Sequence, residues 1–180
     1  MKSKSKSRSR APASPTDGIS LLKKDHAEVR SLLNTLNKAA TDGEQRQRLL
    51  REIELSVQAH TTIEEEIFYP AFRETVRSDT DKKLYFEAIE EHHVADLVMA
   101  ELKETGVELG EFAAKAKVLK DLIEHHVEEE ETHMFPKARK AMGMDVLRDV
   151  GLQMAHRKQQ LIVAVRVCVT LLISERPLGM

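Results

Sequence analysis

Amphipathic segments of helical period dominate the pattern of hydrophobic and polar positions along the chain. The first segment has apolar residues at helical spacing, namely Leu22, Val29, Leu32, Leu33 and Leu36. His26 lies on this apolar stripe, and Asp17 or Ser20 has a side chain able to cap the start of the segment. We therefore expect a first helix that begins close to these caps, buries one face and ends at a turn near residue 40.

A second helix is indicated by Thr41 and Glu44, which have the spacing of a capping box. It is expected to run from about residue 42 to residue 69, and Pro70 then either follows the last turn or kinks the helix. Residues 77–81 favour a loop, because their serine, aspartate and threonine side chains hydrogen-bond to nearby backbone groups in turns.

Two more helices are expected, over about residues 81–104 and 111–135, with Gly106 and Gly110 on either side of the turn between them. Apolar positions mark the buried side of the third helix at Leu84, Ala88, Ala95, Met99 and Leu102, and that of the fourth at Leu119, Leu122, Ile123 and Val127. Short turns between long amphipathic helices predict an all-α fold, an antiparallel up-down-up-down four-helix bundle.

The C-terminal part of the chain differs in kind. Residues 161–173 are apolar nearly all round, but the run is too short for a membrane span and contains Arg166, so we expect no transmembrane segment. Burial against the bundle or in a homo-oligomer interface is favoured over contact with a membrane surface. The expected division is a disordered basic tail and linker (1–16), the bundle (17–142) and a C-terminal helical extension (143–180).

Composition and charge limit the classes of partner. Hydrophobic residues make up 41% of the chain and charged residues 32%, and there is no tryptophan, which fits one helical domain. The formal net charge of -2 gives no reason to expect nucleic acid, and the serine–lysine–arginine run over residues 2–10 is expected to be a solvated tail. The lone Cys168 excludes an internal disulfide and favours a reducing, cytoplasmic compartment.

One pattern occurs twice, 66 residues apart. A histidine, a glutamate four residues later and a proline six residues after that stand at His60, Glu64 and Pro70 and again at His126, Glu130 and Pro136. The same offset relates His26 to His92, and it selects His92 over His93 and His126 over His125. A repeat of this length indicates a duplicated helical hairpin. Helix rise places the four histidines and both glutamates at a similar level of the bundle.

These donors suit two metal ions. Residues four apart on a helix share a face, so each histidine–glutamate pair offers a nitrogen and an oxygen side by side. Four imidazoles and two carboxylates are too many for one tetrahedral zinc, and mixed nitrogen and oxygen sites in bundle cores favour iron or manganese. The alternatives are a bundle whose histidines and glutamates are merely structural, and a protein that binds metal without turnover.

With these motifs the sequence resembles the hemerythrin-like, or HHE cation-binding, family over about residues 20–142. The resemblance implies a four-helix bundle with a non-haem di-iron centre, oxo- or hydroxo-bridged, that reacts with or binds dioxygen, hydrogen peroxide or nitric oxide. It also implies terminal ligands at His26, His60, His92 and His126, and bridging ligands at Glu64 and Glu130.

The chain departs from the oxygen-carrying members of that family. They have a second histidine one turn after the third-helix ligand, where this chain has Asp96, and an aspartate five residues after the last histidine, where it has Glu131. One histidine fewer leaves a coordination position open or filled by another oxygen donor. This favours catalase-like peroxide decomposition over reversible oxygen carriage, and the alternative is a sensor or store for oxygen, nitric oxide or iron.

Overall fold

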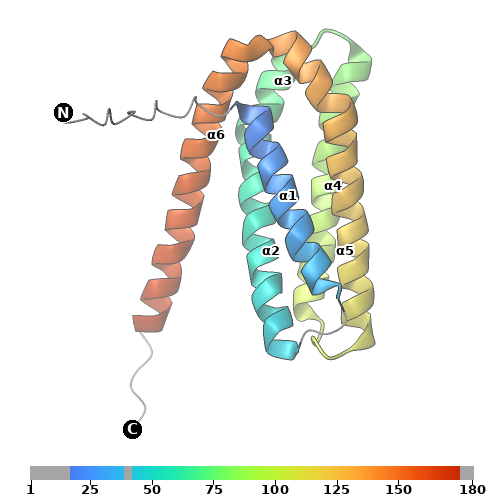
Figure 1. Ribbon diagram of the computed structural model, residues 1–180, viewed down its shortest axis with the longest axis vertical. Coiled ribbons are helices and arrows are strands. Elements are labelled where there is room, and N and C mark those ends of the chain that lie inside the picture. The colour runs from blue at the N-terminus through green and yellow to red at the C-terminus, as the bar shows by residue number, and fades with distance from the viewer. Residues whose placement is uncertain (1–16, 39–41, 175–180) are drawn as a thin grey trace, which may run out of the picture.

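The amphipathic segments of the chain form long helices that pack side by side (Figure 1). The computed structural model describes the backbone of residues 17–38 and 42–174, and the side chains of this range up to residue 164. Four helices run alternately up and down, which confirms the predicted all-α antiparallel bundle. These are α1 (Gly18–Leu36), α2 (Gly43–Ile63), α4 (Asp79–Glu104) and α5 (Gly110–Glu129).

Two of these helices, α1 and α2, begin at an aspartate N-cap. Asp17, rather than Ser20, caps α1, and its carboxylate accepts a hydrogen bond from a first-turn N–H at 3.2 Å. Thr41 of the predicted capping box lies outside the described residues, and the N-cap of α2 is Asp42, which accepts from a backbone N–H at 2.7 Å. A carboxylate both satisfies that N–H and interacts favourably with the positive end of the helix dipole.

The predicted helix ends at residues 69 and 135 are wrong, because both helices continue through their prolines. Between the α-helical parts lie short π-helical segments, in which the backbone bond spans five residues rather than four. The elements in question are η1 (Glu64–Phe68) and α3 (Tyr69–Thr75) after α2, and η2 (Glu130–Met134) and α6 (Phe135–Ser174) after α5.

Proline explains where these wider turns occur. A proline inside a helix has no N–H to donate, and its ring collides with the carbonyl four residues earlier unless the turn widens. Pro70 and Pro136 therefore favour a π turn just before them, and each wide turn begins at a glutamate of the repeat, Glu64 or Glu130. The prolines thus change the backbone at the two residues that carry the candidate chemistry.

The apolar core is divided into two clusters. One contains Phe68, Tyr69 and Phe72 and lies toward the end where α1 and α4 begin. The other contains Leu33, Ile53 and other aliphatic side chains toward the opposite end. Between them all six repeat histidines and glutamates are buried, so a polar layer separates two hydrophobic cores.

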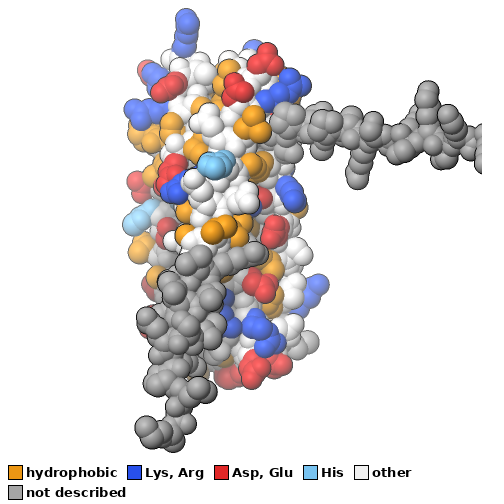
Figure 2. Space-filling model, turned by 90° about the vertical axis from the view of Figure 1, so that its left-hand side faces the viewer, with side chains coloured by type: hydrophobic (Ala, Val, Ile, Leu, Met, Phe, Trp, Pro, Cys, Tyr) orange, Lys and Arg blue, Asp and Glu red, His pale blue; other side chains and the backbone are white. Residues whose placement is uncertain are grey.

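Helix α6 bends sharply at Gly143 and returns along the outside of the bundle beside α1 and α2 (Figure 1). Leu147, Val150 and Met154 are buried in the first apolar cluster, so this part of α6 belongs to the core. On the face that α6 presents, apolar side chains are interspersed with charged ones (Figure 2).

The apolar run over residues 161–173 is helical in the structure. Leu161 packs against the core, whereas Ile162 and Val163 are exposed, and the side chains after Ala164 lie outside the described residues. None of the described helices combines the length and hydropathy that a bilayer crossing requires. Residues 1–16 also lie outside the described part, and the division at residues 142–143 stays a prediction.

Gly143 has φ 74° and ψ 170°, a backbone region that is essentially restricted to glycine. We expect Gly143→Ala to lower the free energy of unfolding by about 1–3 kcal/mol, measured by thermal and urea denaturation. Gly110→Ala is the matched control, because no atom lies within 4 Å of an added Cβ there. That variant should be neutral or slightly stabilised, and equal losses in both variants would contradict the role assigned to the bend.

Candidate metal centre

Each of the four bundle helices contributes one histidine to the polar layer. His26 comes from α1, His60 from α2, His92 from α4 and His126 from α5. The two carboxylates, Glu64 and Glu130, come from the first residues of η1 and η2. The structure thus brings together all six residues selected by the 66-residue repeat, and each is at most 6% exposed.

The six side chains form two groups of potential ligands that have Glu64 in common. The first consists of His26, His60, Glu64 and Glu130, and the second of Glu64, His92 and His126. In each group the ligand atoms lie within 4.8 Å of one another, which is close enough for one metal ion to reach them all. Glu64 Oε2 lies 3.2 Å from His60 Nε2 and 3.4 Å from His92 Nε2, between the two groups.

The second nitrogen of each imidazole faces a carboxylate. The pairs, with their Nδ1–oxygen distances, are His26–Glu131 at 2.9 Å, His60–Asp25 at 3.8 Å, His92–Glu65 at 2.8 Å and His126–Glu91 at 2.8 Å. A carboxylate on Nδ1 orients the ring and leaves Nε2 free to bind a metal. All four Nε2 atoms are accordingly directed toward the shared carboxylates.

Two of these carboxylates were missed by the reasoning from sequence. These two are Asp25 and Glu91. Each precedes a ligand-type histidine by one residue, and Asp25 is related to Glu91 by the same offset of 66. The repeat therefore extends to the carboxylates behind the imidazoles, and the same comparison of the two halves would have found them.

The two halves of the 66-residue repeat differ by one hydroxyl group beside the cluster of potential ligands. Tyr69 and Phe135 occupy equivalent positions in the repeat, and their rings stack on His92 and His26, each with centroids 5.7 Å apart. The fully buried Tyr69 donates a hydrogen bond to Glu130 Oε1 at 2.8 Å, and its oxygen lies 3.4 Å from His92 Nε2. A phenol hydroxyl thus lies beside His92, whereas the equivalent ring beside His26 has none.

The protonation of the cluster reflects its burial. Burial lowers the pKa of His60 to about 4. Burial also opposes ionisation of Glu130, but the charges of His126 and His26 outweigh it and hold its pKa at about 2. The pKa of Glu64 is shifted in the opposite direction from that of Glu130. Burial and the charge of Glu130 raise it well above the usual value.

The donor set therefore fits a cation. Several of its buried atoms, including both oxygens of Glu64 and both ring nitrogens of His60, have no hydrogen-bond partner among the described residues. Such groups cost free energy when left unpaired in a protein interior. A divalent cation would pair with these atoms and favour the ionised form of both carboxylates.

The other histidines stay outside the cluster. His93, His125, His133 and His156 are exposed, in agreement with their expected positions on the surface or outside the ligand set. Asp96, which stands where oxygen carriers have a further histidine, is exposed as well. The hydroxyl of Tyr69, by contrast, lies 3.4 Å from His92 Nε2.

Comparisons with known proteins agree with this geometry. A family model described as Hemerythrin HHE cation binding domain matches residues 17–138. The uncharacterized proteins Rv2633c of Mycobacterium tuberculosis and Mb2666c of Mycobacterium bovis are each 27% identical over 142 residues, covering 78% of this chain and 84% of theirs. In fold, the chain is similar to the crystal structure of a Hemerythrin HHE cation binding domain-containing protein, the Rv2633c homolog from Mycobacterium kansasii. That likeness has a TM-score of 0.73 at 24% identity, over 91% of this chain and 94% of that one.

The hydrogen bond between Tyr69 and Glu130 can be tested without metal. Tyr69→Phe leaves a buried carboxylate oxygen without its donor, so we expect the metal-free protein to lose about 1–3 kcal/mol of unfolding free energy, measured in urea. Tyr85→Phe is the control, because the Tyr85 hydroxyl has no hydrogen bond to the described residues while its ring packs against Tyr69. A loss in the control as large as in Tyr69→Phe would show that ring packing, not the hydrogen bond, is being measured.

Proposed function

Since the chain belongs to the hemerythrin HHE cation binding domain family, we propose that its buried cluster holds two iron ions and that the iron-loaded protein decomposes hydrogen peroxide. The observation that carries the proposal is the position of Glu64, whose carboxylate belongs to both groups of potential ligands. One carboxylate shared by two cations holds them close together, which is the arrangement of two-metal sites in helical bundles.

The ligands would divide as the two groups do. His26 and His60 would hold one ion, His92 and His126 would hold the other, and Glu64 would serve both. Glu130, the second bridge that the resemblance implies, belongs to the first group, and its Oε2 also lies 3.7 Å from His126 Nε2. The ligand atoms are nitrogen and oxygen without thiolate, a set that suits iron or manganese better than a structural zinc. Iron and manganese are both redox-active, and iron is chosen within that pair because the resemblance to the hemerythrin-like family implies a di-iron centre.

The unequal number of ligands supports reactivity with a small molecule. The second group has three protein residues and the first has four, so an ion in the second group keeps more positions for an external ligand. When bound, the two irons would supply the two electrons that cleavage of a peroxide oxygen–oxygen bond requires. Two molecules of peroxide then give one dioxygen and two water molecules, so no further reductant is consumed.

The protein's own residues would position and hold protons in this chemistry. Tyr69 is directed at Glu130 and at His92, so its hydroxyl proton lies at the edge of the second group. Glu65 and Glu131 hold the imidazoles of His92 and His26 in place through their Nδ1 atoms. Burial of the whole layer excludes bulk water from the reacting centre.

Binding of dioxygen, nitric oxide or iron without turnover is the alternative function, and it requires the same ligands. A reducing, cytoplasmic setting and a homo-oligomer formed through the apolar C-terminal segment also belong to this proposal. They are supported by the single Cys168 and by the exposed Ile162 and Val163.

The assignment of ligands predicts which histidines retain metal. We expect protein from iron-replete cells to contain about two iron atoms per chain, measured by elemental analysis. His92→Ala and His126→Ala should lose metal, whereas His93→Ala and His125→Ala, on the exposed side of the same helices, should largely keep it. A single zinc, no metal, or loss only in the second pair of variants would contradict the ligand set.

The proposed activity predicts oxygen release from peroxide. Iron-loaded protein should evolve dioxygen at an oxygen electrode, and Glu64→Ala or Glu130→Ala should abolish it by removing a ligand of the cluster. Glu128→Ala is the control, because Glu128 is an exposed member of the same acidic run. If evolution does not exceed that of free iron while the reduced protein binds oxygen reversibly, the carrier or sensor function replaces the catalytic one.

A further inference from the structure

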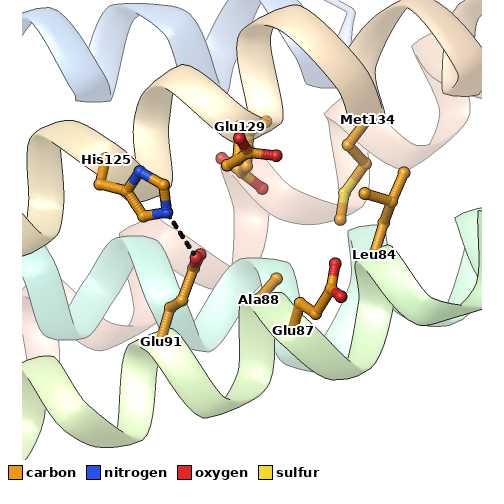
Figure 3. Close-up of a pocket in the computed structure, with 8 residues that line it drawn as sticks. Leu84, Glu87, Ala88, Glu91, His125, Glu129 and Met134 are labelled. Carbon is orange, nitrogen blue, oxygen red and sulfur yellow. Dashed lines mark ion pairs between the residues drawn. The ribbon is translucent and has the colours of Figure 1, made fainter.

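A pocket between α4 and α5 connects the surface with the buried cluster (Figure 3). Its volume is about 150 Å³, and it is lined by Glu87 and Glu91 of α4 and by His125 and Glu129 of α5. Glu130 of the cluster also lines it. No lysine or arginine side chain belongs to this pocket in the described part of the chain.

The carboxylate of Glu130 distinguishes this pocket from an ordinary acidic surface. The Glu130 side chain is only 1% exposed, and its Oε2 atom has no hydrogen-bond partner among the described residues. It faces His26 Nε2 at 3.1 Å and His126 Nε2 at 3.7 Å. The residue Glu130 thus lines the pocket, and its unsatisfied Oε2 atom belongs to the metal centre.

The outer residues repeat the spacing of the inner ligands. His125 and Glu129 are four residues apart on α5, one position before His126 and Glu130, so the helix carries a second histidine–glutamate pair on its outer side. Glu87 and Glu91 are likewise four residues apart on α4 and face this pair across the pocket (Figure 3). Imidazole nitrogen and carboxylate oxygen are ligands that divalent transition metals accept.

Glu91 joins the outer pair to the inner one. One of its oxygens lies 3.5 Å from His125 Nε2, the contact marked in Figure 3, and the other lies 2.8 Å from His126 Nδ1. The Oε2 atom of Glu129 lies 3.0 Å from Nδ1 of the exposed His133. The potential ligands therefore form a continuous series from the exposed His125 to the buried Glu130.

The other half of the repeat lacks this series. The residues one repeat before Glu87, His125 and Glu129 are apolar, namely Leu21, Ala59 and Ile63. Asp25, the counterpart of Glu91, is buried and paired with Lys158 of α6 at 2.7 Å. Duplication alone therefore does not explain the acidic pocket, because it exists only on the half that α6 leaves uncovered.

We propose that this pocket is the uptake route of the metal centre, where a divalent transition-metal cation binds first to His125 and the surrounding glutamates before it reaches Glu130. Three carboxylates around a narrow opening raise the local concentration of cations, but a neutral peroxide molecule gains nothing from their charge. The proposal rests on the proposed function in one respect, namely that the cluster holds metal.

The test measures the rate of metal uptake by the full-length metal-free protein. Anaerobic Fe²⁺ and, as a spectroscopic probe, Co²⁺ are mixed with wild-type protein, with Glu87→Gln/Glu129→Gln and with the control Glu90→Gln/Glu128→Gln. The control removes the same charge from the same two helices at residues outside the pocket. We expect uptake by the pocket variant to be slowed about tenfold and the control to match wild type.

Final metal content separates this inference from the function on which it rests. The pocket variant should reach the same content as wild type, and the uptake rate of wild type should fall with added salt more steeply than that of the variant. Equal rates in the two double variants, with full metal content in both, would overturn the uptake route alone. Absence of any bound iron or cobalt in wild type would overturn the proposed function, and the route with it.

Discussion

Two carboxylates and four imidazoles buried in one layer are the constraint on which the structure depends. Charged or unpaired polar groups are costly inside a bundle, and here the layer separates two apolar clusters that would otherwise be continuous. Three features reduce this free-energy cost without removing it. They are the carboxylates that face the Nδ1 atoms, the hydrogen bond from the phenol of Tyr69, and the raised pKa of Glu64. A metal-binding function explains why a bundle would retain such a layer, because the same unsatisfied atoms become ligands.

The prolines show how the backbone meets this constraint. In a regular α-helix, side chains four residues apart lie on one face. The π turns that begin at Glu64 and Glu130 shift the face on which the later side chains of each helix lie. After η1 the wider turn leads into Tyr69, and after η2 into Phe135, whose rings cover the cluster from one side. Pro70 and Pro136 thus serve the site rather than end the helices.

The helical spacing of apolar residues and the 66-residue repeat were sufficient to predict the four-helix bundle and the four histidines and two glutamates of its polar layer. The features that escaped prediction are those set by contacts between helices distant in sequence. The repeat relates Asp25 to Glu91, but only the fold shows that their carboxylates lie behind His60 and His126. The bend at Gly143 was equally hidden, since isolated glycines tolerate many conformations and tertiary packing selects one.

Helix α6 makes the two halves of the repeat unequal. On one half burial opposes the ionisation of Asp25, but the neighbouring imidazole of His60 and the cation of Lys158 hold its pKa low. On the other half Glu91 is partly exposed and lies among further carboxylates, and no lysine lines that pocket among the described side chains. The imidazoles of His60 and His126 therefore lie before differently compensated carboxylates, so their electron donation to a metal held there would differ. The two halves of the 66-residue repeat thus differ chemically around Glu64, the carboxylate that belongs to both groups of potential ligands.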